Sequence, residues 1–138
     1  MRTALLAAVL ALGAGAACSK SAEKTAAQAS KVPLVSIDEL DQKLAKGGCV
    51  PVDANGTGTR KKMGIVPGAV LLSDSEAFSL SELPADKAKE LVFYCGSTQC
   101  GASHEAAERA LTAGYTNVKV MNEGIAGWVK AGKKVQAL

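Results

Sequence analysis

Aromatic residues are scarce in this chain: Phe, Trp and Tyr together make up only 4% of its 138 residues. A folded core must therefore be built mainly from Val, Leu, Ile and Ala. Strong charge is also lacking, because 16 basic and 13 acidic residues leave a formal net charge of +3. This excess is too small and too scattered to indicate nucleic acid as a partner. The length is enough for one domain and hardly for two.

The apolar run near the N-terminus is too short to cross a bilayer as a helix, which needs about 20 apolar residues. It covers residues 4–12, follows Arg2 and is followed by small residues that end at Cys18. This order predicts an export signal peptide over residues 1–17. A buried N-terminal helix is the alternative, but the segment has no polar residue to form an outer face.

Residues 15–18 (Gly-Ala-Ala-Cys) resemble a bacterial lipoprotein cleavage box. The resemblance implies that Cys18 is lipidated and attaches the protein to a membrane. Such boxes usually have Leu three residues before the cysteine, where Gly15 stands here. Ordinary cleavage after Ala17 is the alternative. Both routes predict an exported protein of the periplasm or cell envelope, where disulfides can persist.

Residues 18–32 are rich in Ser, Ala, Lys and Gln, and we expect a flexible tether there. A folded domain is expected over residues 33–138, where strand-like and helix-like segments alternate. The predicted strands cover residues 34–35, 49–52, 69–72, 91–94 and 118–121. One predicted helix begins after the N-cap Ser36, and the others lie within 80–89 and over 103–113 and 125–131. This alternation predicts an α/β fold of three layers, with a central parallel sheet and helices on both faces.

The stretch from Leu91 to Ser103 carries the strongest chemical signal. A hydrophobic strand ends at Cys95, small and polar residues follow, and a helix then begins. Ligands of parallel sheets bind beyond the carboxyl ends of the strands. Backbone N–H groups of such a loop, together with a helix N-terminus, lower the pKa of a thiol and stabilise anions. Cys95 is therefore a candidate nucleophile, and a buried structural cysteine is the alternative.

Five short motifs in chain order resemble those of the rhodanese family, and the resemblance covers residues 33–138. They are Val52-Asp53, residues 64–69 (Gly-Ile-Val-Pro-Gly-Ala), Phe93-Tyr94-Cys95, residues 114–118 (Gly-Tyr-Thr-Asn-Val) and residues 122–128 (Asn-Glu-Gly-Ile-Ala-Gly-Trp). The resemblance implies a rhodanese-like fold with Cys95 as the sulfur-carrying cysteine. It also implies an active-site loop formed by Gly96, Ser97, Thr98, Gln99, Cys100 and Gly101.

The chain departs from the family pattern at several of these positions. The family's Asp-x-Arg has become residues 53–55 (Asp-Ala-Asn), so that its Arg is missing, and Ile65 replaces a histidine. Active sulfurtransferases often carry Arg just after the nucleophile, where Gly96 stands here. They often carry Arg or Thr at the sixth position of the loop, where Cys100 stands here. The loop therefore lacks a cation for thiosulfate. A related subgroup does carry a second cysteine five residues after the first, as Cys100 follows Cys95 here.

The resemblance implies sulfur transfer, in which Cys95 takes sulfane sulfur from a small donor and passes it to a thiol or cyanide acceptor. No cofactor is expected. A second hypothesis is a thiol/disulfide protein that uses Cys95 and Cys100, since a four-residue spacer with Gly can bring their Cα atoms within the roughly 4.4–6.8 Å of a disulfide. A third is an exported binding module that has kept the fold and lost the activity.

Four residues outside the loop are open to interpretation. Cys49 begins a core strand and is expected to be buried. Trp128 should pack the last helix onto the sheet. His104 can act as an acid or base near Cys95, but a solvated surface position is the favoured interpretation. Asp53 ends a strand near the loop, and structural and functional roles are both open for it.

Two further patterns are expected to carry no chemistry. Residues 55–64 are rich in Gly, Thr and Lys and predict a loop, with the triplet Arg60-Lys61-Lys62 exposed to solvent. Cys95, Cys100 and His104 have spacings loosely like those of zinc ligands. A fourth ligand is not evident, and no metal is expected.

Overall fold

The computed structural model describes residues 31–138. The predicted signal peptide, Cys18 and most of the predicted tether lie outside the described residues. Val32, which the sequence assigns to the tether, is 3% exposed and belongs to the hydrophobic core. None of the helices formed by residues 31–138 is long and apolar enough to cross a membrane.

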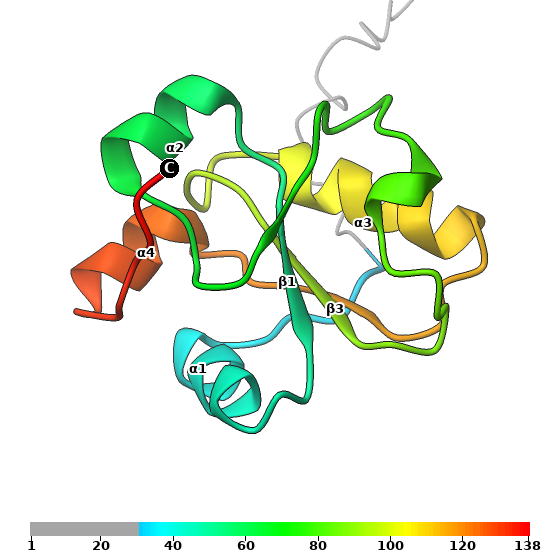
Figure 1. The fold of residues 1–138 in the computed structure, drawn as a ribbon, viewed down its shortest axis with the longest axis horizontal. Helices are drawn as coiled ribbons and strands as arrows, with labels where there is room; N and C mark the ends of the chain where they lie inside the picture. Colours follow the sequence, from blue (N-terminus) through cyan, green and yellow to red (C-terminus); the bar gives the residue numbers. More distant parts are fainter. Residues whose placement is uncertain (1–30) are drawn as a thin grey trace, which may run out of the picture.

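Four strands form one parallel sheet, which confirms the predicted fold class (Figure 1). The strands are β1 (Val50–Asp53), β2 (Val70–Leu71), β3 (Leu91–Tyr94) and β4 (Val118–Val120). Their order in the sheet is β2-β1-β3-β4, and every neighbouring pair is parallel. The predicted strand at 34–35 is reduced to an isolated parallel bridge between Leu34 and Val120. Because all strands run the same way, their carboxyl ends lie at one edge of the sheet.

The helices are α1 (Ile37–Ala45), α2 (Thr57–Met63), α3 (Ala102–Thr112) and α4 (Gly124–Lys130), with a single 3-10 turn, η1 (Leu80–Glu82). The start of α1 is as predicted, since the Ser36 hydroxyl accepts a hydrogen bond of 3.2 Å from the Glu39 N–H. The helix expected within 80–89 is only η1. It is closed by a capping box between Ser79 and Glu82.

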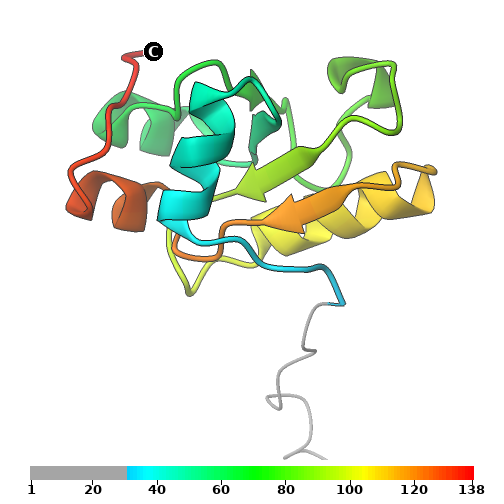
Figure 2. The same ribbon diagram turned by 90° about the horizontal axis from the view of Figure 1, so that it is seen from below.

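The sheet separates two hydrophobic cores, so that helices cover both of its faces as predicted. On one face, Ala106 and Ala110 of α3 pack against Phe93 of β3. Small alanines let this helix lie close to the strands, and Figure 2 shows α3 running along one side of β3 and β4. On the other face, Leu40 of α1 and Trp128 of α4 pack on the sheet. Both the predicted packing of Trp128 and the predicted burial of Cys49 are confirmed.

Helix α2 corrects the prediction of a loop over residues 55–64. Residues 57–63 have no apolar stripe, so their periodicity gives no helix signal. The helix instead buries one charged residue: Arg60 is only 8% exposed, whereas Lys61 and Lys62 of the same triplet face solvent. Gly64, with φ of +78°, ends the helix by donating its N–H to the Arg60 carbonyl.

Candidate active site

Strand β3 delivers Cys95 to the carboxyl edge of the sheet, as the sequence predicted. All four residues of β3 are buried, because the strand lies between two others and is covered on both faces. Cys95 follows directly and is 1% exposed. The strand therefore fixes the position at which Cys95 leaves the sheet, and the chain after it must turn over the edge of the sheet.

The N-terminus of α4 holds the first residues of this turn in place. The Ile125 N–H donates to the Cys95 carbonyl at 2.8 Å, and the Ala126 N–H donates to the Gly96 carbonyl at 3.0 Å. Gly124 makes this approach possible. A Cβ atom on Gly124 would lie 2.6 Å from the Cys95 carbonyl oxygen, and its φ of +63° also favours glycine.

With its carbonyls bound in this way, the loop keeps several N–H groups available. The Cys100 N–H donates to the Ser97 carbonyl at 3.0 Å, and the Gln99 N–H reaches the Ser97 hydroxyl at 3.4 Å. The N–H groups of Gly96, Ser97 and Thr98 have no hydrogen-bond partner in the described part of the chain. The loop amides that can meet an anion are thus those of Gly96, Ser97 and Thr98, whereas those of Gln99 and Cys100 are bonded within the loop.

Helix α3 begins directly after the loop, with Gly101 at its N-cap. Gly101 has no side chain to cap the helix, so the first-turn N–H groups of α3 are not satisfied by a capping side chain. The hydroxyl oxygen of Ser103, in that first turn, lies 3.3 Å from the Cys95 sulfur. Partial positive charge and a hydroxyl donor therefore both lie beside Cys95.

The two cysteines of the loop are joined. The structure pairs Cys95 and Cys100 as a disulfide, with their Cα atoms 6.3 Å apart. This separation lies within the range predicted for the four-residue spacer. The two residues differ in exposure, because Cys95 is buried and Cys100 is partly exposed. Cys49, in contrast, is a free thiol, and burial raises its pKa.

A buried ionic network lies next to the loop and accounts for Asp53. Its carboxylate is fully buried, accepts a hydrogen bond from Arg60 Nε at 3.2 Å and one from the Tyr94 hydroxyl at 2.6 Å. The Nη2 atom of Arg60 donates hydrogen bonds to the backbone carbonyls of Asp53 and Leu72, at 3.0 and 2.9 Å. Burial and the neighbouring Asp53 carboxylate raise the pKa of Tyr94 well above its ordinary value.

The arginine of the Asp-x-Arg pattern is absent, since residue 55 is Asn, but the Asp53 carboxylate is still paired with a guanidinium. Arg60, seven residues after Asp53 and on α2, supplies a guanidinium to that carboxylate instead. A spacing of seven residues carries no sequence signal, because only the docking of α2 brings Arg60 to the end of β1. A buried carboxylate with its charge paired and its oxygens hydrogen-bonded has a structural role here.

Sequence reasoning noted Asn55 only as a departure, but the structure places it at the loop. Asn55 is 8% exposed, and its side-chain oxygen lies 3.6 Å from the point where a Gly96 Cβ would stand. Its Nδ2 atom is buried without a hydrogen-bond partner among residues 31–138. A side-chain amide therefore stands beside the loop, from the position that is Arg in the Asp-x-Arg pattern.

His104 is not the solvated residue that the sequence favoured. It is half-buried, and its Nε2 atom lies 3.1 Å from Asn122 Oδ1, which ties the start of α3 to the turn before α4. No hydrogen bond connects it with Cys95 in the described region. Over the same residues, no group of three or more His, Cys, Asp or Glu side chains is placed to hold a metal ion.

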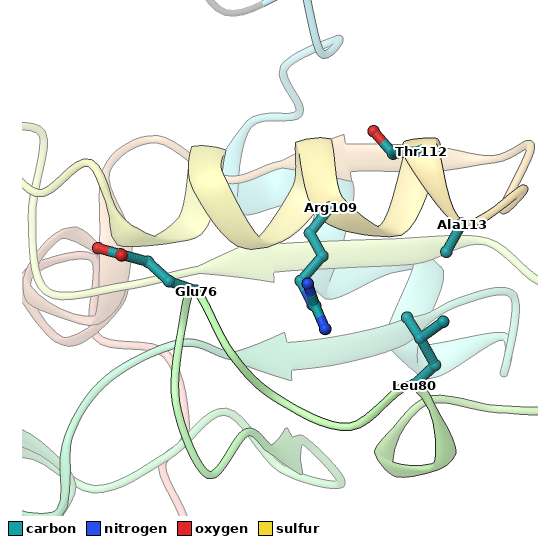
Figure 3. A pocket seen from close by; sticks show the side chains of 5 residues that line it. All are labelled: Glu76, Leu80, Arg109, Thr112 and Ala113. Atoms are coloured by element: carbon teal, nitrogen blue, oxygen red, sulfur yellow. The ribbon is translucent and has the colours of Figure 1, made fainter.

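A pocket of about 370 Å³ lies elsewhere, between the second half of α3 and the segment before η1 (Figure 3). It is lined by Glu76, Leu80, Arg109, Thr112 and Ala113. The guanidinium of Arg109 donates a hydrogen bond of 3.1 Å to the Phe78 carbonyl and lies over the Phe78 ring. The lining contains no thiol, so the Cys95 loop remains the candidate site.

Comparisons with known proteins agree with this geometry. The family model described as Rhodanese-like domain matches residues 36–131. No curated protein matches the chain. A solved Bacillus halodurans protein is 24% identical, with a TM-score of 0.66 over 76% of this chain and 77% of that one. The rhodanese-like domain of an Anabaena protein is 18% identical, with a TM-score of 0.64 over 77% of this chain and 80% of the Anabaena one.

A human single-domain sulfurtransferase is 22% identical to this chain, with a TM-score of 0.58 over 72% of this chain and 96% of the human one. Likenesses at these identities show a shared fold. The family match covers most of the domain and includes the strand that ends at Cys95, the loop after it and the turn into α4. This chain therefore belongs to the rhodanese-like domain family.

Proposed function

We propose that the protein carries sulfane sulfur as a persulfide on Cys95 and passes it to a small acceptor. The observation that carries this proposal is the position of Cys95 at the end of β3, inside a loop that begins with three N–H groups without partners. Membership of the rhodanese-like family supports the proposal. So does the likeness in fold to a human sulfurtransferase.

The proposed reaction has two halves. In the first, the Cys95 thiolate attacks the outer sulfur of thiosulfate, a Cys95–S–S⁻ persulfide forms, and the S–S bond of the donor breaks to release sulfite. In the second, a thiol or cyanide attacks the outer sulfur of the persulfide, and the Cys95 thiolate leaves. One sulfur atom moves in each half, and the cysteine ends in its starting state.

Stabilisation of the anionic sulfur falls to neutral groups. The loop from Cys95 to Gly101 contains no Arg or Lys. The N–H groups of Gly96, Ser97 and Thr98 and the N-terminus of α3 supply partial positive charge instead. Such a site favours a monoanionic persulfide over a dianionic donor, so small persulfides suit it better than thiosulfate.

The Cys95–Cys100 disulfide would block the first half of this reaction, because it consumes the thiolate that attacks the donor. The reduced form is therefore the one that accepts sulfur. Sulfur loading should rise when dithiothreitol is supplied and then removed, and Cys100→Ser should load without that treatment.

We also propose that this chemistry takes place in the cell envelope, with the domain attached through a lipid on Cys18. The support is the sequence of residues 1–18 alone. In an oxidising compartment a dithiol stays reduced only when a reductant is supplied, which makes the state of Cys95 and Cys100 a point of control.

Mass spectrometry of the intact protein tests the proposal. Reduced Cys100→Ser protein treated with an inorganic polysulfide should gain about 32 Da, one sulfur atom, and peptide mapping should place it on Cys95. Cys49→Ser in the same Cys100→Ser background is the matched control and should load normally, since Cys49 is buried away from the loop. Equal loss of loading in folded Cys49→Ser and Cys95→Ser, or an adduct on another residue, would refute the assignment.

A further inference from the structure

The second cysteine of the loop is placed to act on the sulfur that Cys95 carries. Cys100 comes from the far end of the loop, and its sulfur is paired with the Cys95 sulfur. Part of Cys100 packs against the core that contains Cys95, and the rest is exposed. Its N–H is held by the Ser97 carbonyl at 3.0 Å, so the turn that brings Cys100 back to Cys95 is itself hydrogen-bonded.

We propose that Cys100 resolves the Cys95 persulfide and releases sulfide, so that the protein reduces sulfane sulfur as well as carrying it. This inference rests on the proposed loading of Cys95. The Cys100 thiolate attacks the inner sulfur, the Cys95–Cys100 bond forms, the bond to the outer sulfur breaks and HS⁻ leaves. The two thiols are oxidised to a disulfide, and the sulfane sulfur takes up their two electrons.

The inner sulfur is the one attacked, because the contact in the structure joins the two Sγ atoms. The Cys95 side chain is buried and held at the end of β3, so its Sγ stays within reach of Cys100 when it carries a second sulfur. The N–H groups of Gly96, Ser97 and Thr98 can hold the outer sulfur as negative charge develops on it. An attacking group in the same loop also has a large advantage over a free thiol in solution.

Resetting the site requires an external dithiol, and the two cysteine residues differ in their exposure to it. Cys95 is 1% exposed, whereas Cys100 is partly exposed. The first thiol of the reductant therefore attacks Cys100, and Cys95 leaves as a thiolate beside the Ser103 hydroxyl, 3.3 Å away. The second thiol of the reductant then attacks the mixed disulfide and frees Cys100. A dithiol protein or small dithiol is the class of partner that this site needs.

A single-turnover experiment without any added thiol tests the resolution step. Wild type, Cys100→Ser and Cys49→Ser are reduced, desalted under argon and mixed with a modest excess of thiosulfate. Sulfite release reports the loading of Cys95, a methylene-blue assay reports sulfide, and intact mass reports the state of the cysteines. Cys49→Ser is the control, because it removes the only other thiol that the described chain could oxidise.

Wild type and Cys49→Ser should each release about one sulfide per chain and end about 2 Da lighter than the reduced protein, the mass of a disulfide. Cys100→Ser should release at least tenfold less sulfide and keep an adduct of about 32 Da on Cys95. Sulfide release by Cys100→Ser at the wild-type rate would overturn the inference, as would a stable adduct on wild type. Those results leave the loading of Cys95 intact, whereas the absence of sulfite release from every form, together with the absence of a polysulfide adduct on Cys100→Ser, refutes the loading step and the inference with it.

Discussion

Gly124 is the residue on which the shape of the candidate site most depends. An alanine Cβ there would lie 2.6 Å from the Cys95 carbonyl oxygen, 2.6 Å from the Gly96 carbonyl carbon and 2.7 Å from the Ser97 nitrogen. All three are backbone atoms of the active-site loop, so none can move aside as a flexible side chain would. Gly124→Ala must therefore either push the loop off α4 or break the hydrogen bonds that Ile125 and Ala126 donate to it.

The size of the effect can be worked out from two contributions. Alanine at a φ of +63° costs about 1–2 kcal/mol relative to an ordinary conformation. Forcing an extra methyl group into a packed site costs a further 1–3 kcal/mol, roughly. Gly124→Ala should therefore lower the free energy of unfolding by about 2–5 kcal/mol, which is a large share of the stability of a small domain.

Gly47→Ala provides a matched control. Gly47 has a φ of +64°, nearly the same as Gly124, but no atom lies within 4 Å of the position of its Cβ. It should lose only the conformational contribution of about 1–2 kcal/mol. Urea unfolding measures both variants, and polysulfide loading of Cys95 should fall in Gly124→Ala alone. Equal destabilisation of the two variants, with loading of Cys95 unchanged in both, would show that the loop does not depend on this contact.

Arg60→Met should lower the free energy of unfolding by about 3–5 kcal/mol in urea titrations, because it leaves the Asp53 carboxylate buried and unpaired. Lys61→Met, on the exposed side of α2, is the control and should change the free energy of unfolding by less than about 0.5 kcal/mol. Equal effects of the two substitutions would mean that the ion pair adds nothing to stability. Burial raises the pKa of Cys49, so that at pH 8 a smaller fraction of this residue is thiolate than of an unfolded cysteine. Iodoacetamide should therefore label Cys49 more slowly in the native protein than in the urea-unfolded protein. Equal labelling rates in the two states would contradict this. A palmitate analogue should label the wild-type protein but not Cys18→Ser in cells, and labelling of both or of neither would reject lipid attachment at that residue.

Local sequence was sufficient where the physical cause of a structure is itself local. Residues 91–94 are a continuous apolar run, which suits a strand covered on both faces, and β3 has these bounds. Ser36 caps α1 through a hydrogen bond that spans three residues. The alternation of such segments was enough to predict a parallel sheet, and that topology alone places Cys95 at the edge where ligands bind.

Tertiary structure decided the features that depend on contacts distant in sequence. Helix α2 has no apolar stripe, and the burial of Arg60 against Asp53 is a property of the docked helix that no periodicity records. Gly124 meets the loop 29 residues before it only because α4 returns to the carboxyl edge of the sheet. The sequence determined that Cys95 and Cys100 could meet, since their spacer is short. Which of the two cysteines is buried and which is partly exposed was decided by packing, because burial is set by every element that surrounds the loop.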